Sequence, residues 1–253
     1  MNQKVYDKAE KYLTASLEKE AYFLPALTSL ASLYYRQGRY EDALFNCHIA
    51  LSVNAYDGYS NYLYGLCNMA LGNETDAKDG FSVASYSISF RSAAYEKLAE
   101  MFLIACDWKK AEHYAMKSKD FNQQNLKADQ VLMIAYRKMG QMNKAKAVID
   151  SLLDDLPLYH LANKISFAAL IRSELSFETF MEMAEWYETV GCKDEALILF
   201  SFIDDYPIAN YKRAWLLYEK GNISERLEML DRANELSPEY IFPFRSSTIK
   251  VLE

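Results

Sequence analysis

The stretch YYRQGRYEDALFNCHIAL, residues 34–51, decides how the chain folds. One apolar segment ends at Tyr34, a polar turn surrounds Gly38, and a second apolar segment begins at Ala43. In both segments the apolar residues recur at the three- and four-residue spacing of one helix face. A glycine between them suits the left-handed conformation that ends many helices. The stretch therefore predicts a helix, a tight turn and a second helix.

This pattern recurs every 34 residues along the chain. The small residue of the second helix recurs at Ala43, Ala77, Ala111 and Ala145. The turn residue recurs at Gly38, Gly72, Cys106 and Gly140, so the third copy departs from glycine. A large side chain at the small positions would hold the two helix backbones apart, so close packing of each helix pair explains why they stay small.

The spacing resembles the tetratricopeptide repeat (TPR), a 34-residue helix–turn–helix unit with small residues at its eighth and twentieth positions. The resemblance implies an all-α fold, a right-handed α-solenoid of stacked antiparallel helix pairs known as the TPR superhelix. In this register, residues 1–157 hold half a repeat followed by four repeats that begin at residues 24, 58, 92 and 126.

After residue 157 the 34-residue period breaks. Residues 158–176 hold half a period, which we interpret as a compressed irregular repeat or junction. One helix there would invert the up–down alternation of the following helices, whereas two short helices would preserve it, and we favour two. Residues 177–238 hold two further repeats, and residues 239–253 form a trailing C-terminal segment.

A narrower resemblance covers most of the chain and is clearest at residues 170–197 and 235–253. These stretches look like the C-terminal TPR tract of bacterial proteins that carry an N-terminal mutarotase-like domain of unknown function.

No group of residues points to catalysis. The histidines are scattered, and the sequence has no metalloprotease, nucleotide-binding or hydrolase motif. The four cysteines lie far apart without metal-ligand spacing, which favours buried or free thiols in a reducing compartment. We therefore expect a non-enzymatic protein without cofactor or metal, located in the cytoplasm. No apolar run is long enough to suggest a membrane span.

The charge of the chain is negative and uneven. Residues 158–253 hold 10 Lys and Arg against 16 Asp and Glu, whereas residues 1–157 hold 18 against 19. A net charge of −7 repels phosphate backbones, so we expect no nucleic-acid partner.

In TPR proteins the first helix of each pair lines a concave groove, and the resemblance places a set of candidate binding residues there. They are Tyr35, Arg36, Tyr59, Tyr62, Leu66, Met69, Glu96, Glu100, Lys127, Gln130, Arg137, Glu185 and Trp215. The set has an aromatic entrance, a mixed centre and an acidic far end. It suits a protein or peptide with apolar anchors and some basic residues. Alternatively, several of these aromatic rings pack against adjacent repeats.

Two functions remain open. The first is a non-catalytic protein–protein interaction scaffold that binds a protein or peptide segment in the concave groove. The alternative is a structural spacer that packs on an N-terminal domain of its own chain or self-associates. Free groove aromatics would favour the scaffold, and a large apolar patch at an incomplete terminal repeat would favour the spacer.

Overall fold

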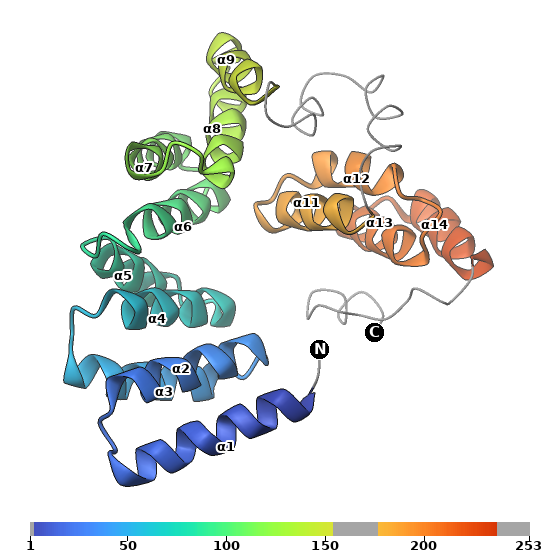
Figure 1. Ribbon diagram of the computed structural model, residues 1–253. Coiled ribbons are helices and arrows are strands. Elements are labelled where there is room, and N and C mark those ends of the chain that lie inside the picture. Colours follow the sequence, from blue (N-terminus) through green and yellow to red (C-terminus); the bar gives the residue numbers. More distant parts are fainter. Residues whose placement is uncertain (1–2, 154–176, 237–253) are drawn as a thin grey trace. The chain divides into compact units, whose positions relative to one another are not determined.

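The computed structural model describes residues 3–153 and 177–236, which contain thirteen helices and no strand (Figure 1). This confirms the predicted all-α class. The helices are α1 (Gln3–Lys19), α2 (Leu24–Arg36), α3 (Tyr40–Val53), α4 (Gly58–Leu71), α5 (Glu74–Ala84), α6 (Arg91–Ile104), α7 (Trp108–Phe121), α8 (Leu126–Lys138), α9 (Met142–Leu153), α11 (Phe177–Thr189), α12 (Lys193–Ser201), α13 (Pro207–Glu219) and α14 (Ile223–Glu235).

The chain divides into two compact units, Met1–Val148 and Ile149–Glu253. In unit 1 each helix from α1 to α7 packs on the next one in the chain, and the first helices also contact each other, α2 with α4 and α6 with α8. Unit 2 contains the pairs α11–α12 and α13–α14. The predicted junction at 158–176 and the trailing segment lie outside the described residues.

The turns within the helix pairs have the predicted left-handed geometry. Gly72 ends α4 with a φ of +80°, a conformation that glycine adopts without a steric penalty. At the equivalent place after α6, Cys106 has a φ of +57°, and among the described residues it is the only non-glycine residue with a positive φ. The third pair therefore keeps the turn of its neighbours at a steric cost to the cysteine.

The small residues lie where the two helices of a pair approach most closely. Ala43, Ala77 and Ala111 are fully buried, as predicted. A Cβ atom on Gly65 would lie 2.7 Å from the ring of Phe81, and a Cβ on Gly80 would lie 2.9 Å from the backbone oxygen of Asn61. Gly80 gives no signal in the repeat pattern, yet it sets the spacing of α4 and α5.

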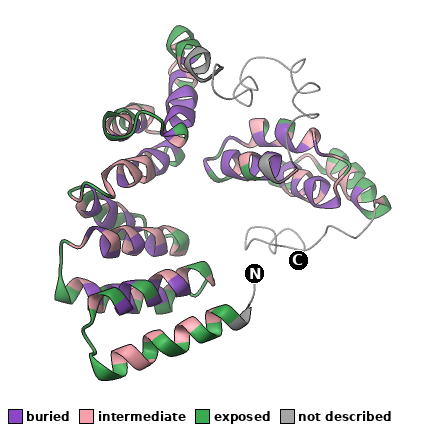
Figure 2. Ribbon diagram, in the orientation of Figure 1, coloured by how far each residue is buried: buried purple, intermediate pink, exposed green. Residues whose placement is uncertain are grey.

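Helix α1 lies where the sequence predicts the incomplete first repeat. Its inner side packs Leu13 and Leu17 against a buried cluster that contains Leu30 and Tyr34. The Tyr34 hydroxyl also donates a hydrogen bond of 3.0 Å to Glu10. None of the described α1 side chains is fully buried (Figure 2). The large apolar side chains exposed on α1 are Val5 and Tyr12, which do not amount to a large apolar patch.

Unit 2 has its own core. Phe180, Ala184, Phe200 and Leu216 are almost completely buried. The final pair departs from the repeat pattern at Arg226, whose guanidinium lies over the Tyr218 ring at 4.7 Å from the centroid. The arginine thus folds back along the exposed side of the pair instead of entering its core.

Candidate protein-binding surface

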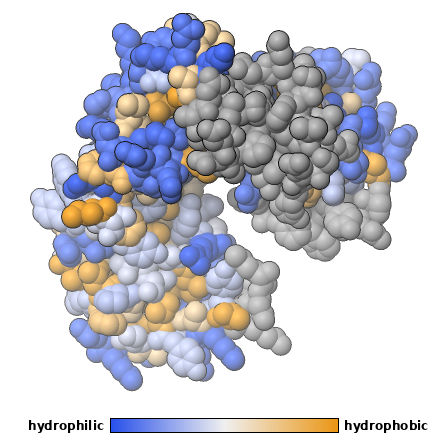
Figure 3. All heavy atoms as spheres, turned by 45° about the horizontal axis from the view of Figure 1, so that its top comes forward, coloured by the Kyte–Doolittle hydropathy of each residue, from blue (hydrophilic) through white to orange (hydrophobic). Residues whose placement is uncertain are grey.

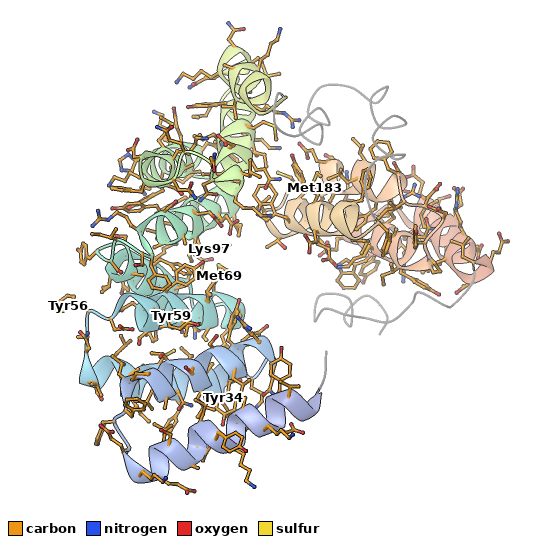
Figure 4. All side chains as sticks on the ribbon, in the orientation of Figure 1. Tyr34, Tyr56, Tyr59, Met69, Lys97 and Met183 are labelled. Atoms are coloured by element: carbon orange, nitrogen blue, oxygen red, sulfur yellow. The ribbon has the colours of Figure 1, made fainter. Side chains whose placement is uncertain are left out.

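The predicted groove residues of unit 1 lie mainly on α2, α4, α6 and α8. We call their shared surface the first-helix face, and define it by Tyr35, Tyr59, Tyr62, Leu66, Met69, Glu96, Lys97, Glu100 and Gln130. Met69 on α4 and Lys97 on α6 are labelled in Figure 4. Figure 3 shows hydrophobic side chains exposed toward the α1–α5 end of unit 1 and mainly hydrophilic ones toward its other end.

The three predicted entrance tyrosines make aromatic contacts within unit 1. The ring of Tyr59 stacks on Phe90 with a centroid separation of 5.4 Å. Tyr62 contacts the same ring at 5.7 Å and Phe81 at 5.6 Å. Tyr35 lies 5.6 Å from Tyr40. All three tyrosines are nevertheless half-buried, so each ring packs on one side and keeps part of its surface exposed.

Burial changes the acidity of two of these hydroxyls. It raises the pKa of Tyr62 to about 12, with smaller effects from Lys97 and the two glutamates of α6. Burial, followed by the neighbouring Tyr40, raises the pKa of Tyr35. Both hydroxyls stay protonated at neutral pH and can act as hydrogen-bond donors.

Leu66 and Met69 form the apolar part of the face. Both are half-buried and pack against the buried cluster that includes Phe81 and Leu98. Arg36, at the end of α2, is exposed. The face therefore combines apolar side chains with a charge at its edge.

A charged trio lies on α6. Lys97 Nζ is 2.7 Å from Glu100 Oε2 and 3.4 Å from Glu96 Oε1. The exposed fractions of the Lys97, Glu96 and Glu100 side chains are 20%, 15% and 8%. Burial lowers the pKa of Lys97, but Glu100 and then Glu96 raise it by more, so the net shift is upward. Counted as one lysine and two glutamates, the trio has a formal net charge of −1.

Asn125 connects this trio to α8. Its Nδ2 donates to Glu96 Oε2 at 2.9 Å and to Ser118 Oγ at 2.9 Å. Its Oδ1 accepts from the backbone N–H groups of Lys127 and Ala128, which caps the start of α8. In the sequence Asn125 looks like an ordinary residue before a helix. Its hydrogen bond to Glu96 in the preceding repeat cannot be predicted from the repeat pattern.

The remaining candidates of unit 1 lie along α8. Gln130 is 7% exposed, and its Oε1 has no hydrogen-bond partner within the described parts of the chain. Lys127 and Arg137 are half-buried. Next to Gln130, Asp129 Oδ1 lies 2.5 Å from Lys119 Nζ, and burial raises the pKa of this carboxyl despite the opposing effect of the lysine.

The two candidates of unit 2 have different surroundings. Glu185 is 7% exposed and lies 3.8 Å from Lys212 Nζ, which also lies 3.1 Å from Glu188 Oε2. Lys212 is completely buried. Burial raises the pKa of Glu188, and Lys212 opposes this effect. Trp215 is half-buried, with its ring 6.0 Å from Tyr218.

The sequence analysis missed Lys212. A usable signal exists, because Lys97 and Lys212 each precede the small residue of a first helix, Ala99 and Ala214, by two positions. A lysine at this place in two repeats marks an inward-directed cation.

Sites for other chemistry are not found in the described residues. No three side chains of metal-ligand type come together within 3–153 and 177–236. Over the same residues, no helix combines the length and the hydrophobicity needed to span a bilayer. His48 and His113 are exposed, and each ring lies edge-on to a tyrosine, Tyr64 and Tyr114 respectively. All four cysteines are free thiols, and Cys106 alone among them is exposed.

Solved structures match this arrangement of helices, although no family model and no curated protein matches the sequence. A tetratricopeptide repeat protein from Parabacteroides merdae aligns over 98% of this chain and 91% of its own, with 14% identity and a TM-score of 0.62. The chain has the tetratricopeptide repeat fold. The C-terminal part of a TPR protein from Cytophaga hutchinsonii aligns over 98% and 95%, with 17% identity and a TM-score of 0.56.

A third similar structure is part of a protein assembly. It is the crystal structure of the APC/C hetero-tetramer Cut9–Hcn1, which matches 98% of this chain with 12% identity and a TM-score of 0.58. The present chain spans 45% of the length of that matched chain.

Proposed function

We propose that this TPR chain is a non-catalytic protein-interaction scaffold that binds a segment of another protein across the first-helix face of unit 1. The observation that carries the proposal is the charged trio of Glu96, Lys97 and Glu100. Apolar side chains of similar size would stabilise the array at least as well as a largely buried ion pair. Because the three groups lie on one helix and remain partly exposed, the trio is better explained by recognition than by stability.

The surroundings of the trio favour a particular partner chemistry. Its net negative charge suits a lysine or arginine of the bound segment. Tyr62, which interacts with all three charged groups, offers half-buried surface beside the trio, and Tyr59 and Met69 add half-buried surface on the same helix. This surface suits an apolar anchor. Oε1 of Gln130 is buried without a hydrogen-bond partner among the described residues, which is unfavourable. If the Gln130 side chain turns outward, this oxygen can accept a hydrogen bond from the bound segment. The partner that we infer is therefore a segment with an apolar anchor next to a basic residue.

The similarity in fold to a chain of the Cut9–Hcn1 hetero-tetramer supports a role in protein association. The alternative role, packing on an N-terminal mutarotase-like domain or on a second copy of the chain, would use a different surface. A fusion to such a domain that protected the outer side of α1 from hydrogen exchange would favour this alternative.

The scaffold is tested by selecting ligands from a library of displayed random peptides with the full chain. We expect the selected peptides to combine an apolar residue with lysine or arginine and to bind in titration calorimetry. A chain with Glu96→Gln and Glu100→Gln should bind them at least tenfold more weakly. The matched control is Glu18→Gln with Glu228→Gln, which changes two exposed glutamates on α1 and α14. A labelled mixed-sequence RNA tests nucleic acid as a ligand, and we expect no binding.

Selected peptides that ignore the Glu96→Gln, Glu100→Gln change would place binding elsewhere and contradict the proposal. The tyrosines are best tested as Tyr62→Phe, which removes the hydroxyl and keeps the ring contacts with Phe81 and Phe90. Replacing the whole ring by alanine would confuse loss of binding with loss of packing.

A further inference from the structure

The second helices of unit 1 carry an ordered change of charge. The third residue of each is Asp42 in α3, Asp76 in α5, Lys110 in α7 and Lys144 in α9. These four residues, which we call the charge row, are spaced by 34 positions and are all exposed. Along the array the row therefore reads acid, acid, base, base.

The residues around the charge row have the same polarity. Residues 40–86 hold six Asp and Glu against one Lys, a net charge of −5. Residues 107–148 hold nine Lys and Arg against four Asp and Glu, a net charge of +5. The two ends of the row thus belong to regions whose net charges are opposite in sign and equal in magnitude, in a chain whose total charge is −7.

Helix stability does not account for the basic half of the row. Acids in the first turn interact favourably with the helix macrodipole, and α3 and α5 each have two. The first turns of α7 and α9 have no acid, and both carry lysine instead. A cation at this end of a helix is unfavourable, so a role outside the helix is the better explanation for Lys110 and Lys144.

Local ion pairs neutralise the row only in part. Asp42 pairs with Arg39 at 2.7 Å, Lys110 with Asp107 at 3.0 Å and Lys144 with Glu112 at 3.4 Å. The side chains of Asp42, Lys110 and Lys144 are still 53%, 60% and 57% exposed. Asp76 interacts with the Tyr64 hydroxyl and is also exposed. Exposed pairs of this kind hold their partners weakly, which leaves the charges available to a second molecule.

We propose that a second copy of this chain docks on the charge row in an antiparallel orientation. A two-fold axis across the middle of the row reverses its order in the partner. Both acids then face lysines, and both lysines face acids, so one surface is complementary to itself. A parallel arrangement would place like charges opposite each other. Exposed apolar side chains on the same helices, Phe45, Met116 and Met142, supply area that such a contact buries.

This contact is separate from the first-helix face, so it leaves the proposed binding function intact. Sedimentation velocity of the full chain tests it at about 10 mM and about 1 M NaCl, where the Debye length is ~30 Å and ~3 Å. At low salt we expect a concentration-dependent species of twice the 29.2 kDa chain mass, and at high salt the monomer. A chain that stays monomeric at both salt concentrations overturns the proposal.

Charge reversal identifies the surface. Asp42→Lys with Asp76→Lys makes the row uniformly basic, and Lys110→Glu with Lys144→Glu makes it uniformly acidic. Each variant alone should dimerise at least tenfold more weakly than the native chain, and an equimolar mixture should form a heterodimer. The controls, Glu18→Lys with Glu228→Lys and Lys8→Glu with Lys11→Glu, make the same charge changes at exposed places elsewhere and should dimerise like the native chain.

Far-ultraviolet circular dichroism shows whether the variants fold. Folded variants that fail to form a heterodimer overturn the proposal, as do variants that dimerise like the native chain. If only Lys110→Glu with Lys144→Glu weakens dimerisation, the basic half binds acidic residues elsewhere in another copy, and this result also overturns the proposal. If the reversals unfold the chain, the milder pair Asp42→Asn with Asp76→Asn and Lys110→Gln with Lys144→Gln replaces them, and each must weaken dimerisation at least threefold.

Discussion

Lys97 in unit 1 and Lys212 in unit 2 occupy the same place in their repeats but are paired in different ways. Lys97 contacts Glu96 and Glu100, which lie on its own helix. Lys212, on α13, contacts Glu185 and Glu188, which lie on α11 of the preceding pair. The exposed fraction of the side chain is 20% for Lys97 and 0% for Lys212.

We infer that an ion pair between two repeats and an ion pair within one helix serve different purposes. An ion pair that crosses from one repeat to the next resists their separation, because opening the contact would leave charges unpaired in the core. A pair within one helix does not itself join two repeats, although Asn125 links Glu96 to α8, and it instead shapes the surface above it. We therefore assign Lys212 to cohesion of unit 2 and Lys97 to recognition on unit 1.

The largest effect is expected from Lys212→Met. The change leaves two acids without their counter-charge in the core, and we expect unit 2 to lose about 3–5 kcal/mol of unfolding free energy. Urea unfolding checks this in a Trp108→Phe background, where Trp186 and Trp215 report on unit 2 alone. Adding Glu185→Gln and Glu188→Gln should recover part of the loss. A cost below about 1 kcal/mol would contradict the cohesive role.

The same variant should depend on pH. The pKa of Glu188 is raised by burial, and Lys212 holds it down, so removing the lysine raises it further. A carboxyl with a raised pKa stabilises the folded state fully below its ordinary value of 4.5, and loses this contribution as the pH rises through the folded value. The cost of Lys212→Met should therefore shrink between pH 7 and pH 5. Equal urea midpoint differences at both pH values would contradict this.

Gly80→Ala tests an uncharged contact in unit 1, and its stability loss can be compared with those of the lysine variants. Its Cβ would lie 2.9 Å from the backbone oxygen of Asn61 and the backbone nitrogen of Gly65, neither of which can move away easily. We expect a loss of about 2 kcal/mol, although alanine favours a helix by ~1 kcal/mol. Thermal unfolding measures it, with Ser82→Ala on the exposed side of α5 as control. An unchanged or raised melting temperature would refute the close contact.

Lys97→Met should cost less stability than Lys212→Met but affect binding more. Solvent reaches part of Lys97 and Glu96, whereas Lys212 is completely buried, so we expect a loss of about 1–3 kcal/mol in unit 1. Peptides selected for a basic residue should bind this variant more tightly than the native chain, because removing Lys97 makes the face more negative. A cost equal to that of Lys212→Met would remove the distinction between the two lysines.

The smallest effect concerns the turn of the third repeat. Cys106→Gly should stabilise unit 1 by about 0.5–1 kcal/mol. Glycine has no Cβ, so it removes the steric strain of the left-handed backbone conformation at this position. Cys106→Ala, which keeps the Cβ, is the control and should gain nothing. If both variants have the same melting temperature, the positive φ of Cys106 is not a source of strain.

The repeat pattern predicts the parts of the fold that obey packing rules common to every copy. Buried alanines such as Ala43 and Ala77, and the left-handed turns, follow from the 34-residue period alone. Gly80 and the second role of Asn125 do not, because each depends on contacts that one repeat makes and the others lack.

The sequence predicts which positions lie on the candidate surface, but it does not predict which neighbouring side chains they contact. Tyr62 falls on the predicted face, yet its contact with Phe90 depends on a loop residue outside the helix pattern. Glu185 likewise falls on a predicted position, but the buried Lys212 that pairs with it comes from the next repeat. Which side chains stay available to a partner depends on these neighbours.

The most direct test of the account is hydrogen–deuterium exchange of the full chain with and without a peptide selected for binding. A segment lying on the first-helix face should slow exchange in α2, α4 and α6, with the strongest protection around Glu96–Glu100. Exchange in α3, α5 and α7 should stay unchanged. Protection confined to these second helices would contradict the account, because it would place the partner on the opposite surface of the repeats.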